Sequence, residues 1–228
     1  MTEITKTLNK CERPQNSKID ISFCELSMED ESNLQDLIDE CSSLKIANTF
    51  SKSRFSRIFE KPKNRLEKLE LICVDFRDES QIISIFKSCQ SLKTLNLSGI
   101  RVASSTTSFM DPQLPAAIIA LPHLVNLDLS FNSSWISEQN WNQLLKELEK
   151  LEELAMNETK CDVQFESDWL PHLSIFSARG SDLHWDSIFE MLSVSDRITR
   201  VDVRFSTIDS SLPEELQKGN LRIGDILY

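Results

Sequence analysis

One spacing pattern recurs along the chain and limits its possible folds more than any other feature. Residues 92–97 have leucine at the first, fourth and sixth positions, and residues 66–71 and 124–129 repeat this L-x-x-L-x-L pattern. Three weaker copies follow, and the six copies of the pattern begin at Leu66, Leu92, Leu124, Leu151, Leu173 and Ile198. Such alternation of apolar and polar residues is typical of a short strand with one buried face. The spacings of 26, 32, 27, 22 and 25 residues therefore predict a series of short strands.

Two further copies lie upstream and bring the total to about eight repeats. Residues 19–26 fit the second half of the pattern well. Residues 44–48 fit the pattern poorly, and their register is ambiguous by a few residues.

Between the strands, apolar residues change to a spacing of three and four, which is typical of a helix with one buried face. Five segments show this spacing: residues 34–41, 82–89, 114–121, 141–148 and 185–192. Pro115 is expected in the first turn of its helix, where a missing N–H costs nothing. Asp78 with Gln81 resembles a capping box at another helix start. Strands that alternate with helices predict an α/β fold with a parallel sheet.

These residues resemble the leucine-rich-repeat superfamily, whose signature is L-x-x-L-x-L-x-x-N/C-x-L. Asn132 and Cys24 occupy the N/C position, whereas apolar or hydroxyl residues replace it elsewhere, so an irregular hydrogen-bond ladder is expected. The resemblance covers residues 16–210 and implies a solenoid of about eight repeats, with a curved parallel sheet inside and helices outside. The repeat length resembles the intracellular, ribonuclease-inhibitor-like or cysteine-containing type. Residues 1–15 and 211–228 are then expected to form an N-terminal and a C-terminal cap.

Composition and charge narrow the classes of partner. The chain has 228 residues and a net charge of -11, which disfavours nucleic acid because nucleic acid needs a basic footprint. One basic run, from Lys52 to Lys68, is the exception and could meet RNA, a phospholipid surface or an acidic protein. Pro62 interrupts this run, which is expected on the convex side, so nucleic acid remains disfavoured. No apolar stretch approaches a membrane span, and the N-terminus lacks the features of a secretory signal. We therefore expect the protein in the cytoplasm or nucleus, with its six cysteines as free thiols.

The sequence contains no motif that indicates an enzyme, a cofactor or a metal site. His123 and His172 both lie in Leu-Pro-His-Leu, at the same point of two repeats, so we interpret them as repeat residues. No H-E-x-x-H motif and no Cys/His cluster with zinc spacing is present. The four glycines cannot build a phosphate-binding glycine-rich loop. We predict a protein that is not an enzyme and that uses neither cofactor nor metal.

Candidate binding residues follow from strand alternation, which sends the third, fifth and seventh positions to the concave face. The residues predicted to bind a protein there are Asp128, Glu153, Asn157, Arg179, Arg200, Asp202 and Arg204. Arg179 and Arg204 share the seventh position in adjacent repeats, and with Arg200 they are hypothesised to receive an acidic residue or a phosphate from a partner. The alternative is that Asp202 and Asp182 neutralise these arginines within the chain.

A second set of candidates is aromatic and lies at the rim. Phe23, Phe131 and Phe205 all occupy the eighth position, just past the strand, and Trp135 follows closely after Phe131. They are either exposed anchors of the kind that dominate interfaces or residues that pack into the turn above the core. Residues 103–113, rich in serine and threonine, are expected to form a protruding loop that contacts a partner, accepts phosphate or is a tolerated insertion.

The pattern favours a scaffold or adaptor that binds a partner protein through the concave face and rim, as a monomer or as a subunit of a hetero-complex. One alternative is the substrate-recognition subunit of a cullin-RING ubiquitin ligase, although residues 1–15 are too short for an F-box. Another alternative is a structural or regulatory subunit of a larger complex.

Overall fold

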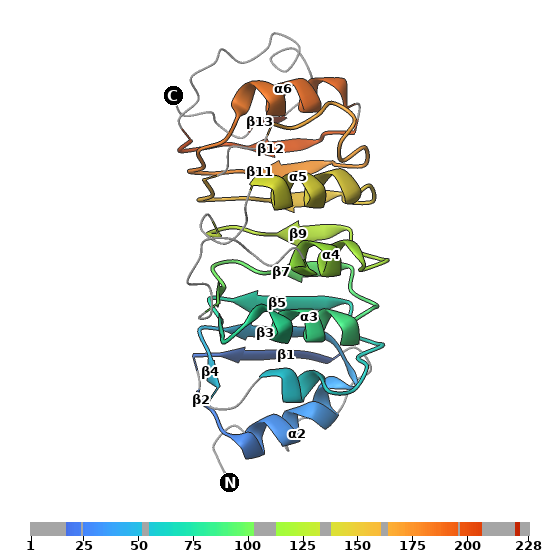
Figure 1. Cartoon of the computed structure of the whole chain (residues 1–228), viewed down its shortest axis with the longest axis vertical. Coiled ribbons are helices and arrows are strands. Elements are labelled where there is room, and N and C mark those ends of the chain that lie inside the picture. The colour runs from blue at the N-terminus through green and yellow to red at the C-terminus, as the bar shows by residue number, and fades with distance from the viewer. Residues whose placement is uncertain are drawn as a thin grey trace.

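The computed structural model describes residues 17–23, 25–51, 55–102, 113–132, 138–160, 164–195, 197–206 and 222–223. One nine-stranded parallel sheet runs through this part of the chain, with its strands stacked in chain order (Figure 1). The strands are β1 (Ser17–Ser22), β3 (Cys41–Ala47), β5 (Lys68–Ile72), β7 (Thr94–Asn96), β9 (Asn126–Asp128), β10 (Glu153–Ala155), β11 (Ile175–Ser177), β12 (Arg200–Asp202) and β13 (Arg222–Ile223). The predicted α/β solenoid with a parallel sheet is therefore present.

Helices cover one face of the sheet and leave the other face open (Figure 1). They are α2 (Met28–Ile38), the 3-10 helix η1 (Phe55–Phe59), α3 (Glu79–Ser88), α4 (Gln113–Ile119), α5 (Glu138–Glu147) and α6 (Trp185–Val194). Consecutive elements of this layer pack together from α2 through η1, α3 and α4 to α5. Residues 164–173, between β10 and β11, contain no helix, so the helical layer is interrupted before α6.

Two small parallel sheets lie beyond the turns that follow the strands. One joins β2 (Glu25–Leu26) to β4 (Phe50–Ser51), and the other joins β6 (Asp75–Phe76) to β8 (Arg101–Val102). Their inward residues, such as Leu26 and Phe76, are buried, whereas the residues before them are exposed.

The core is a set of columns in which equivalent residues of successive repeats stack on one another. The fourth-position column consists of Leu44, Leu69, Leu95, Leu127, Leu154, Phe176 and Val201, all at most 3% exposed. Each such side chain contributes roughly 1.5–3 kcal/mol when a neighbouring repeat covers it. The stack settles the register that the sequence left ambiguous, because Leu44 pairs with Leu69 and is a fourth-position residue. Cys41, expected at a helix end, instead begins β3.

Helix starts and the inter-repeat ladder follow local chemistry. Asp78 caps α3, as expected, but Gln81 accepts from Arg77 N and so does not complete the box. The full capping box lies at α2 instead, between Ser27 and Asp30. The ladder at the N/C position is made by Asn132 to Leu97 O at 2.8 Å, Ser181 to Met156 O at 2.6 Å, Ser206 to Ala178 O at 2.7 Å and Thr49 to Ile21 O at 3.0 Å. In two repeats Val74 and Ile100 occupy this position, and their side chains have no hydrogen-bond donor. The ladder is therefore irregular, as the sequence predicted.

Candidate protein-binding rim and concave face

A left-handed turn follows the strand in each of eight successive repeats. Eight residues in the eighth position have positive φ, between 48° and 65°: Phe23, Asn48, Cys73, Gly99, Phe131, Glu158, Gly180 and Phe205. The N–H of each of the first seven donates to the seventh-position carbonyl of the next repeat, as in Phe23 N to Ala47 O at 3.0 Å and Gly180 N to Arg204 O at 2.9 Å. The eight residues therefore form one row along the rim of the sheet, which we call the turn row.

Three of the turn-row residues are phenylalanines whose side chains face solvent. Phe23 is 81% exposed, Phe131 62% and Phe205 71%. A positive φ is uncommon for residues other than glycine, and it costs a bulky side chain roughly 1–2 kcal/mol. Exposing a large apolar ring at a strained position helps neither the core nor the turn. Of the two readings of these residues, the structure therefore favours exposed rim residues over residues packed into the turn. Trp135 lies outside the described residues.

The small turn-row residues leave space for their neighbours. A Cβ added to Gly180 would lie 2.4 Å from Glu158 Oε1, because the Glu158 side chain lies over Gly180. A Cβ added to Gly99 would lie 3.1 Å from Cys73 Sγ and 3.8 Å from Phe131 Cβ. In each case the side chain of the preceding turn-row residue lies against the glycine.

The arginines of the concave face gather around a single carboxylate. Arg204 donates to both oxygens of Asp202, from Nε at 2.9 Å and from Nη2 at 2.8 Å, and Arg179 Nε lies 3.8 Å from Asp202 Oδ2. The hydrogen bond from Arg204 is the main cause that lowers the pKa of the Asp202 carboxyl, against the opposing effect of burial. Asp182 does not take part, since it pairs with Lys160 at 3.0 Å.

One carboxylate cannot neutralise the whole cluster. Arg200 is exposed, makes no ion pair with any described residue, and pairs in register with Arg222 on β13. The structure thus brings Arg179, Arg200 and Arg204 to one end of the concave face, and we call these three residues with Asp202 the arginine patch.

Hydrogen bonds fix the middle of the concave face. Asn96 Nδ2 donates to Asp128 Oδ2 at 3.0 Å, and Asn157 Oδ1 accepts from Ser177 Oγ at 2.7 Å and from Arg179 N at 2.8 Å. Asp128 and Asn157 are therefore held rigid, whereas Glu153 is exposed at the start of β10. The expectation that every seventh position faces outward is wrong at Ser98 and Ser130, which are 7% and 2% exposed.

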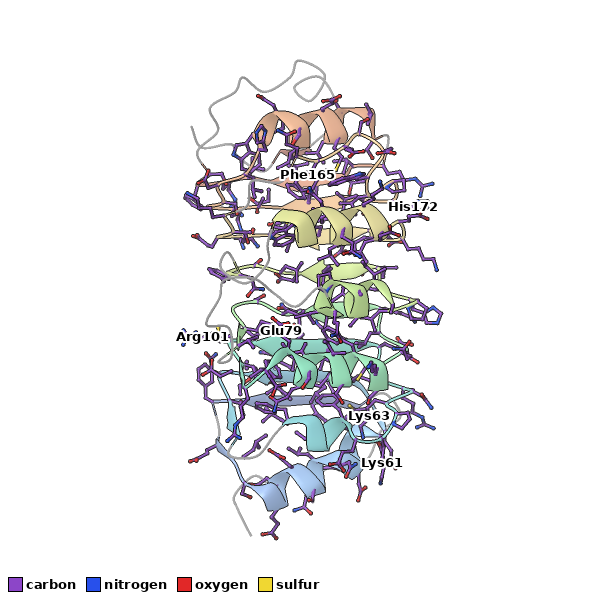
Figure 2. The ribbon with its side chains drawn as sticks, viewed as in Figure 1. Lys61, Lys63, Glu79, Arg101, Phe165 and His172 are labelled. Carbon is purple, nitrogen blue, oxygen red and sulfur yellow. The ribbon has the colours of Figure 1, made fainter. Side chains whose placement is uncertain are left out.

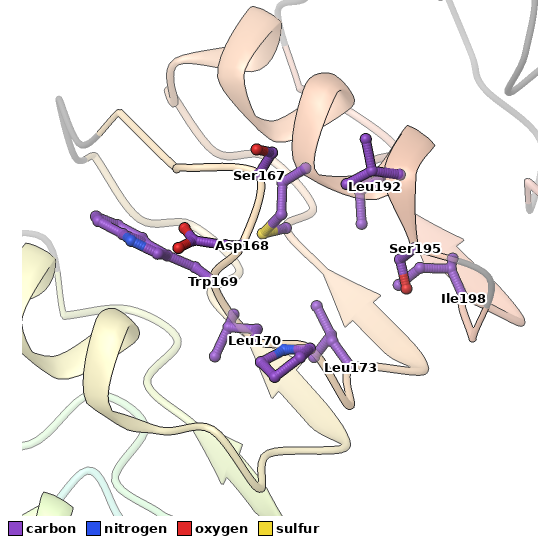
Figure 3. Close-up of a pocket in the computed structure, with 11 residues that line it drawn as sticks. Ser167, Asp168, Trp169, Leu170, Leu173, Leu192, Ser195 and Ile198 are labelled. Carbon is purple, nitrogen blue, oxygen red and sulfur yellow. The ribbon is translucent and has the colours of Figure 1, made fainter.

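Two hollows lie away from the turn row. A cavity of about 170 Å³ opens where the helical layer is interrupted, between α6 and residues 167–173, and Leu170, Leu173 and Leu192 help to line it (Figure 3). A wider polar hollow lies at the strand starts and includes Lys93 and His123. Figure 2 shows Arg101 on the turn-row side and His172 on the opposite side.

The basic run between Lys52 and Lys68 is smaller at the surface than its sequence suggested. Lys63 is 1% exposed, and its ammonium donates to Asp39 and, at 3.3 Å, to Gln35 O at the end of α2. The described residues hold no group of three or more potential metal-ligating side chains. Among the helices described, none has the length and apolar character needed to cross a membrane.

We compared the chain with known proteins to identify its fold. No protein-family model and no curated protein matches the sequence. Among solved structures, the complex of TLR13 with ssRNA13 is similar over 91% of this chain and 32% of that chain, with a TM-score of 0.52 and 15% identity. TLR13 is a leucine-rich-repeat protein. The fold is a leucine-rich-repeat solenoid.

A second solved structure supports the same architecture. A protein from Bacteroides fragilis aligns over 97% of this chain and 78% of that chain, with a TM-score of 0.50 and 13% identity. The chain spans about a third of the TLR13 chain, and at these identities the likeness shows the fold alone. The function must therefore be inferred from the residues of the rim and the concave face.

Proposed function

We propose that this chain is a non-enzymatic scaffold or adaptor that binds a partner protein through the concave face and rim of the solenoid. The observation that carries the proposal is the exposure of Phe23, Phe131 and Phe205 at strained positive-φ positions along one rim. Strain that contributes nothing to the core points to a function. Aromatic residues that protrude from a rigid frame are the kind of residue that anchors protein interfaces.

The arginine patch supplies the polar part of the proposed surface. Arg200 has no counter-ion among the described residues, and Asp202 is shared by Arg179 and Arg204. A carboxylate or phosphate from a partner fits such a cluster, because guanidinium groups bind planar oxyanions in a bidentate way. The partner segment therefore carries apolar side chains for the rim and an anion for the patch.

A protein suits this surface better than a nucleic acid does. The TLR13 structure holds a single-stranded RNA, but the present chain has a net charge of -11, and among its described residues the exposed arginines of the concave face gather at one end. RNA binding along the solenoid needs a longer basic surface. We place the protein with the intracellular, ribonuclease-inhibitor-like type of repeat, acting in the cytoplasm or nucleus.

The test is purification of the tagged chain from its native cells, with co-purifying proteins identified by mass spectrometry. The Arg200→Glu variant is compared in parallel, because Arg200 makes no ion pair with a described residue and its reversal leaves the fold intact. Arg65→Glu, on the opposite rim, is the matched control, because Arg65 is also an exposed arginine that makes no ion pair with a described residue. A partner in near-equal amount that is lost with Arg200→Glu and kept with Arg65→Glu supports the patch. A partner kept by both variants contradicts the role of the arginine patch. A co-purifying cullin adaptor favours the ligase alternative.

A further inference from the structure

A tight turn precedes the strand in each of five successive repeats. Each turn is closed by a hydrogen bond from the first-position N–H to the carbonyl three residues earlier, as in Leu173 N to Leu170 O at 2.9 Å. The second residue inside each turn lies directly before the first position, and these residues are Arg65, Ser91, His123, Lys150 and His172. We call these five residues the start row. It lies at the strand starts, on the side opposite the turn row, where Figure 2 labels His172.

Backbone hydrogen bonds hold the start row in register from repeat to repeat. The N–H of each second-position residue donates to the second-position carbonyl of the repeat before it, as in Lys93 N to Glu67 O and Ser174 N to Glu152 O, both at 2.8 Å. The turns therefore stack at the spacing of the strands, which is about 4.8 Å per repeat.

The fold does not require cationic side chains in the start row. Turns favour glycine, proline, asparagine, aspartate or serine, yet arginine, lysine or histidine occupies four of the five positions in this acidic chain. All four side chains are exposed, and none makes an ion pair with a described residue. Lys150 donates only to Pro122 O, at 3.2 Å. Side chains that serve neither the core nor the turn are available to a partner.

The first part of the start row borders a polar hollow of about 800 Å³. Arg65, Ser91 and His123 line this hollow, and Lys18, at the start of β1, lines its far end. The hollow therefore reaches from β1 to β9, which are four strand steps apart, or about 19 Å.

The charges of the hollow leave two cations without a counter-ion. Of its carboxylates, Glu67 pairs with Lys93 at 3.0 Å, and Glu40 already has a partner. Lys18 and Arg65 are exposed and make no ion pair with a described residue.

The other end of the start row is less cationic. There Glu149 and Glu152 are exposed close to Lys150 in the sequence and offset its charge. The part of the row that suits an anion is therefore the hollow.

We propose that this hollow binds an extended acidic segment of a partner protein. An extended chain rises about 3.3 Å per residue, so about six residues fill the length of the hollow. Lys18 and Arg65 pair with carboxylates of the segment, and Ser91 and His123 form hydrogen bonds with it. Single-stranded nucleic acid fits less well, because it is bound by aromatic stacking, and no phenylalanine, tyrosine or tryptophan is among the described residues that line the hollow. This surface lies on the rim opposite the turn row and is separate from the proposed function.

The first test is fluorescence anisotropy of a fluorescein-labelled hexaglutamate peptide, titrated with the purified chain at low salt. The wild-type chain is expected to bind the peptide, and binding should weaken as salt screens the exposed charges. Arg65→Glu should weaken binding roughly tenfold, because it replaces an attraction with a repulsion.

Arg101→Glu is the matched control for this measurement. Arg101 is also an exposed arginine that makes no ion pair with a described residue, but it lies on the turn-row side (Figure 2). The substitution changes the net charge by the same amount, so binding of hexaglutamate should stay within about twofold of the wild type.

A gain of binding gives a second test that misfolding cannot mimic. Ser91 lies between Arg65 and His123 in the start row, so Ser91→Lys adds a cation in the middle of the hollow. Hexaglutamate should then bind severalfold more tightly than to the wild type. Fluorescein-labelled hexauridylate under the same conditions tests for a nucleic acid.

Three outcomes overturn the proposal. The first is that the wild-type chain does not bind hexaglutamate at low salt. The second is equal weakening by Arg65→Glu and Arg101→Glu, which would mean that net charge alone attracts the peptide. The third is that hexauridylate binds more tightly than hexaglutamate, which would make the partner a nucleic acid.

These results are independent of the arginine patch. If hexaglutamate does not bind but Arg200→Glu loses a partner from native cells, the hollow fails and the proposed function stands. If hexaglutamate binds as expected but Arg200→Glu keeps every partner, the patch fails and the hollow stands. In the co-purification, a protein that Arg65→Glu loses and Arg200→Glu keeps belongs to the hollow, so the two substitutions report on separate surfaces.

Discussion

Replacing an exposed turn phenylalanine with asparagine removes the aromatic ring at almost no cost to folding. Phe23 is the clearest case, because its side chain is 81% exposed and its φ is 55°. Only about a fifth of the ring is buried, and full burial of a phenylalanine is worth about 1.5–3 kcal/mol, so its removal costs about 0.3–0.6 kcal/mol. Asparagine tolerates positive φ and recovers about 0.5–1 kcal/mol of the strain.

The free energy of unfolding of Phe23→Asn is therefore expected to be unchanged or higher by up to about 0.7 kcal/mol. Since 1 kcal/mol shifts the melting temperature of a chain of this size by about 2–4 °C, the shift stays within about 3 °C. Urea unfolding followed by circular dichroism measures the difference. Phe23→Ala is the matched control, because it removes the same ring without relieving the strain, and we expect it to be about 0.5–1 kcal/mol less stable than Phe23→Asn.

A buried phenylalanine gives the contrasting result. Phe176 is fully buried in the fourth-position column, and Phe176→Ala is expected to cost about 3–5 kcal/mol. A loss above about 1.5 kcal/mol for Phe23→Asn would mean that this ring packs as part of the fold. The argument that the rim phenylalanines are kept for binding would then be refuted.

Three other changes probe the turn row, the patch and the core. Gly180→Ala should lower the free energy of unfolding by about 1–2 kcal/mol, measured by urea unfolding, because φ is +63°, while the Glu158 carboxylate that the new Cβ meets ends a flexible side chain and can move aside. Arg204 lowers the pKa of the Asp202 carboxyl, so the ionised Asp202 stabilises the fold at pH values above the usual carboxyl pKa of 3.8. This stability is lost as the pH falls through the lowered pKa. Unfolding measured between pH 2 and 7 should therefore depend less on pH in Asp202→Asn. Burial raises the pKa of the Cys89 thiol to about 12, so its alkylation at pH 8, followed by peptide mass spectrometry, should be on the order of a thousandfold slower than that of a free thiol.

Controls make these predictions specific. Glu158→Ala in the Gly180→Ala background removes the contact with Glu158 but not the positive φ, so most of the loss should remain. Lys45 pairs with Asp20 at the other end of the sheet, so Lys45→Ala is the control for the pH measurement. This substitution removes an ion pair but leaves the arginine patch unchanged. Cys73 is exposed and should be alkylated in the folded protein, whereas equal rates for Cys73 and Cys89 would contradict the burial of Cys89.

The sequence by itself determined the strands and the core. Leu69, Leu95 and Leu127 stack in one buried column because strand alternation depends only on which local positions are apolar. The pattern failed at Leu44, where Cys41 in the first position was read as a helix residue. A small apolar residue fits a helix end and a strand start equally well, and only pairing with β5 decided the register.

The candidate site was predicted in part. The sequence placed the three phenylalanines at one repeat position, and Gly99 and Gly180 at the same position are a local signal for positive φ that could have revealed the turn row. It did not decide whether the rings were exposed, because the turn that carries them is fixed by hydrogen bonds to the next repeat, such as Phe131 N to Asn157 O at 2.8 Å.

Tertiary structure alone decided how the charges are shared and which residues meet across the repeats. Asp202 contacts Arg179 as well as Arg204, its neighbour two positions along the chain, while Asp182 pairs with Lys160. The contacts of Asp202 with Arg179 and of Asp182 with Lys160 join residues 23 and 22 positions apart, so they depend on how the repeats stack. The burial of Lys63 beside Asp39 has the same origin. Local alternation fixes which face a side chain takes, but only the stacking of one repeat on the next fixes its neighbours.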